Sequence, residues 1–146
     1  MSHNPDFKDL FKSLNAAEVE YLIVGAHAVV FYSEPCYTKD LNIWVNPTPV
    51  NAIRVYNALR DFGAPLKGIQ AEDFTREDMI FQIGVAPNRI DILMGIKGVV
   101  FAEAWPNRKH SSYDTVPIAI LGKEDLVKAK RASNRPQDQL DLTFLT

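Results

Sequence analysis

Residues 37–45, YTKDLNIWV, combine the pattern of a buried strand with two polar residues that such a strand does not need. Leu41, Ile43 and Val45 occupy alternate positions and therefore share one face. Asp40 and Asn42 share the opposite face, with their Cα atoms roughly 6.5 to 7 Å apart. The stretch predicts a strand that buries one face and presents a carboxylate and a carboxamide on the other.

Upstream, the sequence predicts a helix followed by a strand, a turn and a second helix. Asn4 can cap a helix that begins at Pro5, and apolar residues follow at helical spacing. EYLIVG, residues 20–25, is typical of a buried strand that ends in a turn at Gly25. AHAVVFYSE, residues 26–34, contains no helix breaker, so a helix is expected directly after the glycine.

Downstream, a long helix and a hairpin are expected. Thr48 can cap a helix that runs through apolar residues at helical spacing to Gly63. MIFQI, residues 79–83, and RIDILM, residues 89–94, flank GVAPN, whose composition favours a turn. These two runs predict an antiparallel hairpin.

The rest of the chain predicts a loop at 64–73, a short helix near 99–105 and a strand within 115–121. Two helices broken at NRP, residues 134–136, complete the pattern. The fold class expected from this order is α+β, with a mixed β-sheet of about four to five strands flanked by helices.

The composition is that of a globular protein. At 146 residues, one domain spanning 1–146 is expected, with the helices of 122–145 packed on it. Hydrophobic residues make up 47% and charged residues 23%, and neither a membrane span nor a signal peptide is recognisable, so a cytoplasmic protein is predicted. Cys36 is the single cysteine, which excludes an internal disulfide and a thiolate zinc cluster. A formal net charge of −2 argues against wrapping a nucleic-acid backbone by charge alone.

A third polar residue interrupts the predicted hairpin. Asp91 lies between Ile90 and Ile92, where a strand would otherwise be apolar. An unpaired buried carboxylate costs several kcal/mol, so a cation or a hydrogen-bond donor is expected beside it. If Asp40, Asn42 and Asp91 converge, their oxygen atoms would suit a hard cation such as Mg²⁺. The alternative for either aspartate alone is a hydrogen bond to a nearby amide at a strand end, and for Asn42 alone it is a structural side-chain amide that satisfies backbone groups.

The turn VGAHAV, residues 24–29, suggests a phosphate-binding element. Gly25 permits a tight connection from strand to helix, and the amides of Ala26 and His27 would lie at a helix N-terminus, which favours anions. The His27 side chain itself is expected to be packed or solvated rather than catalytic.

YLIVGAHAV at 21–29, YTKDLNIWV at 37–45 and NRIDIL at 88–93 together resemble the nucleotidyltransferase superfamily that includes DNA polymerase beta. The similarity continues through most of the chain, in residues 51–65, 81–93, 101–105 and 128–138. The chain is similar to small bacterial nucleotidyltransferases related to abortive-infection and toxin–antitoxin proteins. This resemblance implies the polymerase beta-like fold.

The resemblance assigns roles to individual residues. Gly25 matches the first small residue of the family's turn, and Ala26 stands where a glycine or serine is usual. Asp40 and Asp91 match metal-binding carboxylates, while Asn42 stands where the family has a second aspartate. The resemblance therefore implies a catalytic, metal-binding set of Asp40, Asn42 and Asp91 that holds Mg²⁺ or Mn²⁺, with Asn42 as a weakened ligand.

Further contacts are implied for the nucleotide. Lys130 could face the triphosphate, and Thr38 and Lys39, which flank the metal strand, could contact phosphate. Arg135 and Asp138 are expected to tie the last two helices together. The alternative for the basic C-terminal segment is a solvated helix face with ion pairs.

Two functions remain open at this point. The first is transfer of a nucleoside monophosphate from a nucleoside triphosphate to a hydroxyl acceptor on RNA, such as transfer RNA, or on a protein. The second is a catalytically degenerate protein that binds nucleotide or an antitoxin partner, which Asn42 suggests. A membrane partner is not expected, and the sequence does not fix the base, the acceptor or the oligomeric state.

Overall fold

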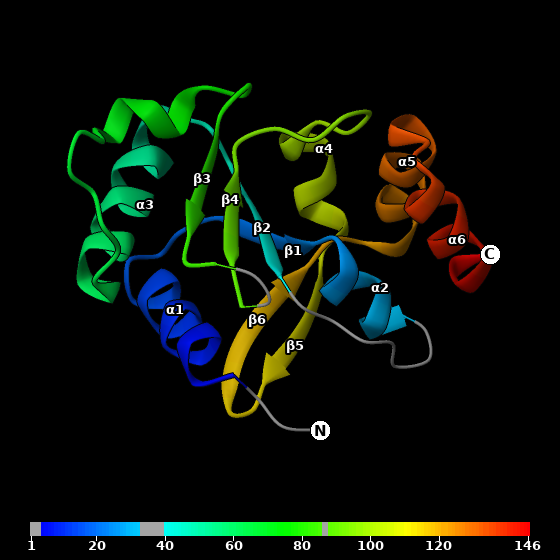
Figure 1. Ribbon diagram of the computed structural model, residues 1–146, viewed down its shortest axis with the longest axis horizontal. Coiled ribbons are helices and arrows are strands. Elements are labelled where there is room, and N and C mark those ends of the chain that lie inside the picture. Colours follow the sequence, from blue (N-terminus) through cyan, green and yellow to red (C-terminus); the bar gives the residue numbers. More distant parts are fainter. Residues whose placement is uncertain (1–3, 33–39, 86–87) are drawn as a thin grey trace.

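The apolar runs of the sequence form a six-stranded mixed sheet, shown in Figure 1. The computed structural model describes residues 4–32, 40–85 and 88–146. The strand order is β3-β4-β2-β1-β6-β5. The strands are β1 Tyr21–Val24, β2 Leu41–Val45, β3 Ile80–Ile83, β4 Ile90–Leu93, β5 Lys109–Tyr113 and β6 Val116–Ile120. The predicted α+β class is confirmed, but the expected count of four to five strands is wrong.

The strand that the sequence pattern did not reveal is β5. Its sequence, KHSSY, has no apolar alternation, because β5 pairs only with β6 at the edge of the sheet and its residues are largely exposed. Edge strands of this polar kind resist pairing with another chain. A period-two apolar pattern is produced by one buried face, and β5 has none to bury.

The first and third helices begin at capping side chains that the sequence provides. The helices are α1 Pro5–Ala16, α2 Ala26–Tyr32, α3 Pro49–Phe62, α4 Phe101–Ala104, α5 Lys123–Ser133 and α6 Pro136–Leu145. The Asn4 side chain accepts hydrogen bonds from the first-turn amides of α1, and Thr48 caps α3 in the same way. Gly63 ends α3 with a φ of 97°, which favours glycine. No helix within the described residues is both long and apolar enough to span a bilayer.

Two short segments differ from the sequence predictions. The segment 64–73, predicted as a loop, leads into a 3-10 helix at Ala71–Thr75. Its Phe74 is fully buried and packs edge-on against Phe81. The predicted helix at 99–105 is only the four residues of α4, followed by a 3-10 turn at Trp105–Asn107.

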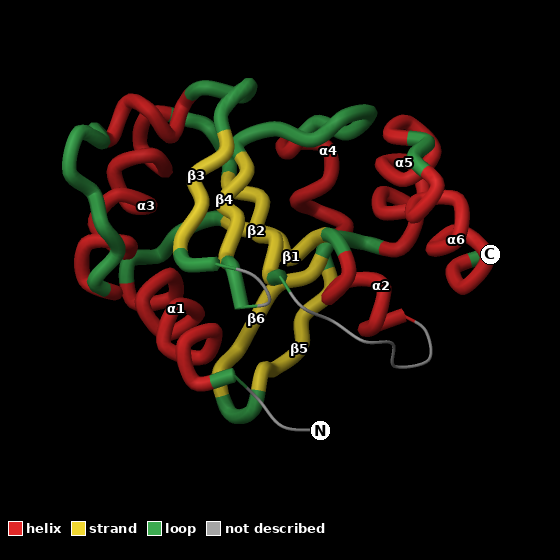
Figure 2. The backbone as a smooth tube through the Cα atoms, viewed as in Figure 1, coloured by secondary structure: helices red, strands yellow, loops and turns green. Residues whose placement is uncertain are grey.

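The sheet separates two groups of helices, as Figures 1 and 2 show. Helices α1 and α3 lie on one side. Leu41, Ile43 and Val45 of β2 are completely buried, and strand alternation gives them the face opposite that of Asn42. Burial of each such side chain contributes about 1.5 to 3 kcal/mol. Helices α2, α4, α5 and α6 lie on the other side, so the predicted polar face of β2 is directed toward them.

Strand register places the polar residues. β2 and β4 are parallel, with Asn42 opposite Asp91, and β1 is antiparallel to β2, with Val24 opposite Asn42. β3 and β4 form the predicted antiparallel hairpin, in which Gln82 is opposite Asp91. Residues 86 and 87 of its turn lie outside the described residues. Asn42 and Asp91 are therefore neighbours on two interior strands.

Candidate functional site

Two rows of residues cross the parallel strand pair on its polar face. Asn42 and Asp91 form one row. Asp40 and Arg89 form the next row, because they directly precede Leu41 and Ile90, which are register partners. The Arg89 main-chain N–H donates to Asp40 Oδ1 at 3.3 Å, which fixes this second row. The structure thus brings together the three predicted metal-site residues and adds an arginine.

The Arg89 guanidinium binds both carboxylates. Its Nε lies 2.8 Å from Asp91 Oδ1 and its Nη2 lies 3.1 Å from Asp91 Oδ2. The same Nη2 lies 3.2 Å from Asp40 Oδ2. The hydrogen bond to Asp91, together with the charges of Asp91 and Asp40, raises the pKa of Arg89 further. Arg89 is therefore the cationic partner that the buried carboxylate of Asp91 requires.

Sequence reasoning predicted a partner for Asp91 but did not identify it. The signal was present in NRIDIL, because Arg89 stands two positions before Asp91 and side chains at this spacing share a strand face. The second ion pair, to Asp40, depends on the pairing of β2 with β4, which a local pattern does not reveal.

Gly25 is fitted closely to Asn42. Gly25 has a φ of 72°, in the left-handed region that favours glycine. A Cβ atom on Gly25 would lie 3.2 Å from Cγ and 3.3 Å from Cβ of Asn42, and would collide with its Nδ2 atom. The position therefore requires glycine for two reasons, and the Asn42 carboxamide packs over the turn.

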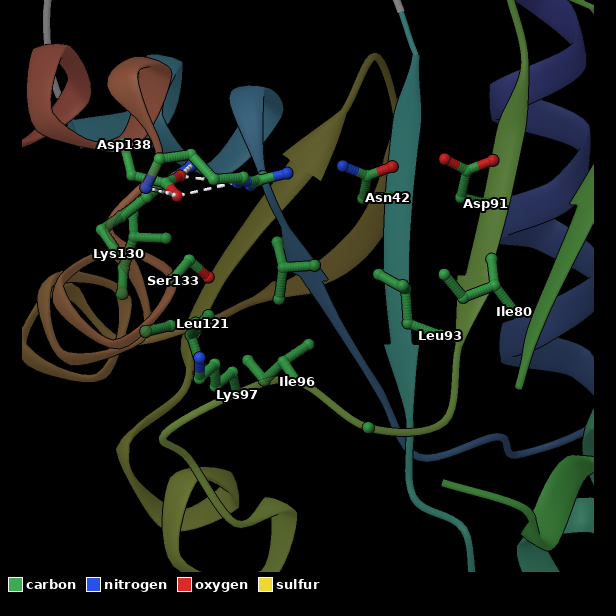
Figure 3. Close-up of a pocket in the computed structure, with 16 residues that line it drawn as sticks. Asn42, Ile80, Asp91, Leu93, Ile96, Lys97, Leu121, Lys130, Ser133 and Asp138 are labelled. Atoms are coloured by element: carbon green, nitrogen blue, oxygen red, sulfur yellow. Dashed lines mark hydrogen bonds and ion pairs between the residues drawn. The ribbon is translucent and has the colours of Figure 1, made fainter. Parts of the chain in front are cut away.

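A cavity of about 480 Å³ lies between this face of the sheet and helices α5 and α6, as Figure 3 shows. Asn42 and Asp91 line one wall, and Gly25 lines it from the β1–α2 turn. Lys130 and Asp138 line the opposite wall. The volume falls within the range of about 300 to 1,000 Å³ that is typical of small-molecule sites.

Buried ion pairs organise the helical wall. The Lys130 side chain is 9% exposed, and its Nζ lies 3.3 Å from Asp138 Oδ1 and 3.0 Å from Asp141 Oδ2. Lys130 belongs to α5 and both aspartates belong to α6, so this lysine ties the two helices together. Arg135 binds Asp138 through Nε at 2.8 Å and Nη2 at 3.2 Å.

The Arg135–Asp138 contact is local to the start of α6. Arg135 is the N-cap of that helix, and its main-chain N–H also donates to Asp138 Oδ2 at 3.1 Å. Burial opposes ionisation of Asp138, but the hydrogen bonds from Arg135 and Lys130 outweigh burial and lower its pKa. The predicted tie between the last helices therefore includes Asp138 but depends on Lys130 as well.

The remaining predicted residues have different surroundings. Ala26 begins α2 and is not among the described residues that line the large cavity. His27 lines a separate cavity of about 160 Å³, and its ring lies edge-on to Phe7, with 5.6 Å between ring centroids. Its packed position agrees with the sequence prediction. Thr38 and Lys39 lie outside the described residues.

Asp40, Asn42 and Asp91 have oxygen donors of the kind that a hard cation takes, but only two of them are charged. Among the described residues, no group of three or more His, Cys, Asp or Glu side chains is arranged to hold a metal ion. Asp40 and Asp91 nevertheless converge on one cationic group, the guanidinium of Arg89, which stands in for an ion. Carboxylate and amide oxygens, which Asp40, Asn42 and Asp91 carry, are the kinds of ligand that Mg²⁺ prefers. The chemistry of the donors therefore fits, while Arg89 occupies the position.

Comparison with known proteins supports the fold. No protein-family model matches the chain, and no curated protein matches its sequence. The structure is similar to the crystal structure of a "putative nucleotidyltransferase" from Thermotoga maritima, with a TM-score of 0.62 and 12% sequence identity. The match covers 94% of this chain and 88% of the other.

The chain shares the fold of this structure. At 12% identity, the similarity establishes the arrangement of helices and strands and not the chemistry. The α+β fold expected from the sequence is confirmed, and the similarity to this structure agrees with the fold that the motifs implied.

Proposed function

We propose that this chain binds a nucleoside triphosphate in the 480 Å³ cavity and transfers its nucleoside monophosphate to a hydroxyl group. The observation that carries this proposal is the register pairing of Asn42 with Asp91. This pairing supports the proposal because both side chains carry oxygen atoms and line the cavity wall that also contains the Gly25 turn, opposite Lys130. The nucleotidyltransferase fold supports the same reaction class.

In this reaction the hydroxyl oxygen forms a bond to the α-phosphorus, and the bond between the α- and β-phosphates breaks. Pyrophosphate leaves with the electron pair, and the hydroxyl proton passes to a carboxylate or to water. Such transfers depend mainly on positioning and on stabilisation of negative charge. Lys130 would face the phosphates from α5 while its Nζ stays paired with Asp138 and Asp141. The apolar wall around Leu93 and Ile96 would exclude water from the nucleotide.

A divalent ion belongs to the proposal. Asp40, Asp91 and the amide oxygen of Asn42 would hold Mg²⁺ or Mn²⁺, which neutralises phosphate charge and activates the hydroxyl when bound. Asn42 offers one neutral oxygen where a carboxylate offers two charged ones. Changes to the outer partners of metal sites lower affinity by about 10- to 100-fold, so the loss of a charged ligand costs at least as much. We therefore propose weak transfer activity, with an RNA such as transfer RNA or a protein as the acceptor.

A second candidate function is nucleotide binding without transfer. It is favoured by Asn42 together with Arg89, which pairs with both remaining carboxylates. A protein of this kind would sense nucleotide, or bind an antitoxin-like partner, without turnover.

The two candidates are separated by a transfer assay. Each of the four α-³²P nucleoside triphosphates is incubated with the native chain and Mn²⁺ or Mg²⁺, with cellular RNA and protein as acceptors. Label transferred by the native chain and lost in Asp91→Asn supports the enzyme. Asp61→Asn is the matched control, because Asp61 is exposed in an ion pair with Arg60. Nucleotide binding without transfer, with transfer gained in Asn42→Asp, supports the second candidate.

A further inference from the structure

One arginine engages every carboxylate oxygen of the candidate metal site. Both Asp91 oxygens accept from the Arg89 guanidinium, at 2.8 and 3.1 Å. Asp40 Oδ2 lies 3.2 Å from the same guanidinium, and Asp40 Oδ1 accepts from the Arg89 main-chain N–H at 3.3 Å. The planar guanidinium suits this arrangement, because it can bind one carboxylate through two nitrogens and still reach another.

We propose that Arg89 is a tethered competitor of the divalent ion, so that the ion binds Asp40 and Asp91 only when the guanidinium is displaced. The identity of the ligand rests on the proposed function. Arg89 is the additional group that regulates access of the ion to the site. An ion bound at 2.0 to 2.1 Å from these oxygens would lie close to a guanidinium 2.8 to 3.2 Å from them. Repulsion between the two cations prevents joint occupation.

The charges around the site favour the arginine in the absence of an ion. Two carboxylates and one guanidinium carry a net charge of −1, and Asn42 adds none. The Asp91 side chain is only 12% exposed, so it would be costly to leave unpaired. An incoming ion must therefore replace Arg89 rather than bind beside it.

The Arg89 side chain can also move into solvent. It is 33% exposed, and Arg89 is not among the described residues that line the large cavity. Displacement would move the guanidinium into water without crossing the cavity, while Asp91 would gain the ion as its new partner. Arg89 thus sets the ion concentration at which the site opens, independently of the nucleotide.

The test is Mn²⁺ binding to the intact chain without nucleotide, measured as free Mn²⁺ by electron paramagnetic resonance. Arg89→Gln removes the charge and is expected to bind Mn²⁺ at least about tenfold more tightly than the native chain. Arg60→Gln is the matched control, because Arg60 forms an exposed ion pair with Asp61, and its Mn²⁺ affinity is expected to be native. The double variant Arg89→Gln with Asp91→Asn is expected to lose the gain.

Thermal unfolding gives a second reading. In EDTA, Arg89→Gln is expected to unfold at a lower temperature than the native chain, because Asp91 loses its partner. Mn²⁺ is expected to raise the unfolding temperature of the variant and so remove this difference. Arg89→Lys keeps a charge but cannot bind Asp91 through two planar nitrogens, so intermediate Mn²⁺ affinity is expected. This variant provides the comparison if Arg89→Gln does not fold.

Mn²⁺ binding in Arg89→Gln that is equal to or weaker than native would overturn the proposal and leave Arg89 a structural partner of Asp91. If Arg89→Gln does not fold, native Mn²⁺ affinity in a folded Arg89→Lys would do the same. Tighter Mn²⁺ binding with no nucleotidyl transfer would retain the competition and reject the proposed reaction. Transfer by the native chain with unchanged Mn²⁺ affinity in the variants would do the reverse.

Discussion

Asn42 of β2 and Asp91 of β4 are register partners across a parallel strand pair, so a neutral carboxamide lies beside a buried carboxylate at the cavity wall. The carboxamide adds no repulsion to Asp91. A second carboxylate at position 42 would instead repel Asp91 and so favour a cation between the two.

Asn42→Asp is expected to make the stability of the chain depend on a divalent ion. A third carboxylate near Asp91 and Asp40 adds repulsion, so the melting temperature in EDTA should fall, and Mn²⁺ should raise it above that of the native chain. Gln82→Glu is the control, because Gln82 is the partner of Asp91 on its other side. An equal Mn²⁺ response in both variants would show that added charge, and not a ligand at position 42, is responsible.

Gly25→Ala is expected to destabilise the fold and disturb the site. The positive φ costs about 1 to 2 kcal/mol for a residue with a Cβ, and the new methyl group would push against the Asn42 carboxamide. Gly68→Ala is the control, since Gly68 has a φ of 81° with no atom close to its added Cβ. Urea unfolding and nucleotide binding measure the two effects. Equal losses of stability and unchanged nucleotide binding would contradict the close fit of Gly25 to Asn42.

Lys130→Met is expected to lower the free energy of unfolding by about 3 kcal/mol, because it removes one partner from a buried ion-pair group. Lys128→Met, at an exposed position of the same helix, should change stability little. Urea denaturation at pH 7 compares the two. A small effect of Lys130→Met would mean that Arg135 keeps Asp138 satisfied and that Gln137, which donates to Asp141 Oδ1 at 2.8 Å, does the same for Asp141.

The free energy of unfolding is expected to fall as the pH drops below about 6.5, the ordinary pKa of histidine. Burial lowers the pKa of His27, although the charge of Asp40 opposes this effect. Below the ordinary value the unfolded chain binds the proton more readily than the folded chain, so acid favours unfolding. Chemical denaturation between pH 8 and pH 5 measures the slope.

His27→Leu should reduce that slope, whereas His110→Ala, on the exposed edge strand β5, should not. An unchanged slope in His27→Leu would assign the acid sensitivity to other groups.

Local patterns in the sequence predicted the elements that have a buried face or a cap. The alternation in YTKDLNIWV predicted β2, and Asn4, Thr48 and Gly63 marked helix ends that the structure confirms. The same patterns did not reveal β5, because an exposed edge strand has no apolar period.

The candidate site was only partly predictable, for a related reason. Asp40, Asn42 and Asp91 were identified because polar residues interrupt apolar strands. No local pattern marked Arg89 as a site residue, because arginine is common beside a turn. Its importance depends on the alignment of β2 with β4, a contact between distant parts of the chain.

The parallel pairing of β2 with β4 also has a consequence for how the protein acquires its site. Asp40 and Arg89 are separated by 49 positions, with α3 and β3 between them. Contacts over such separations form slowly, because a long loop must close before the contact contributes any stability. The Arg89 ion pairs are therefore expected to form late during refolding, after contacts within the local helices.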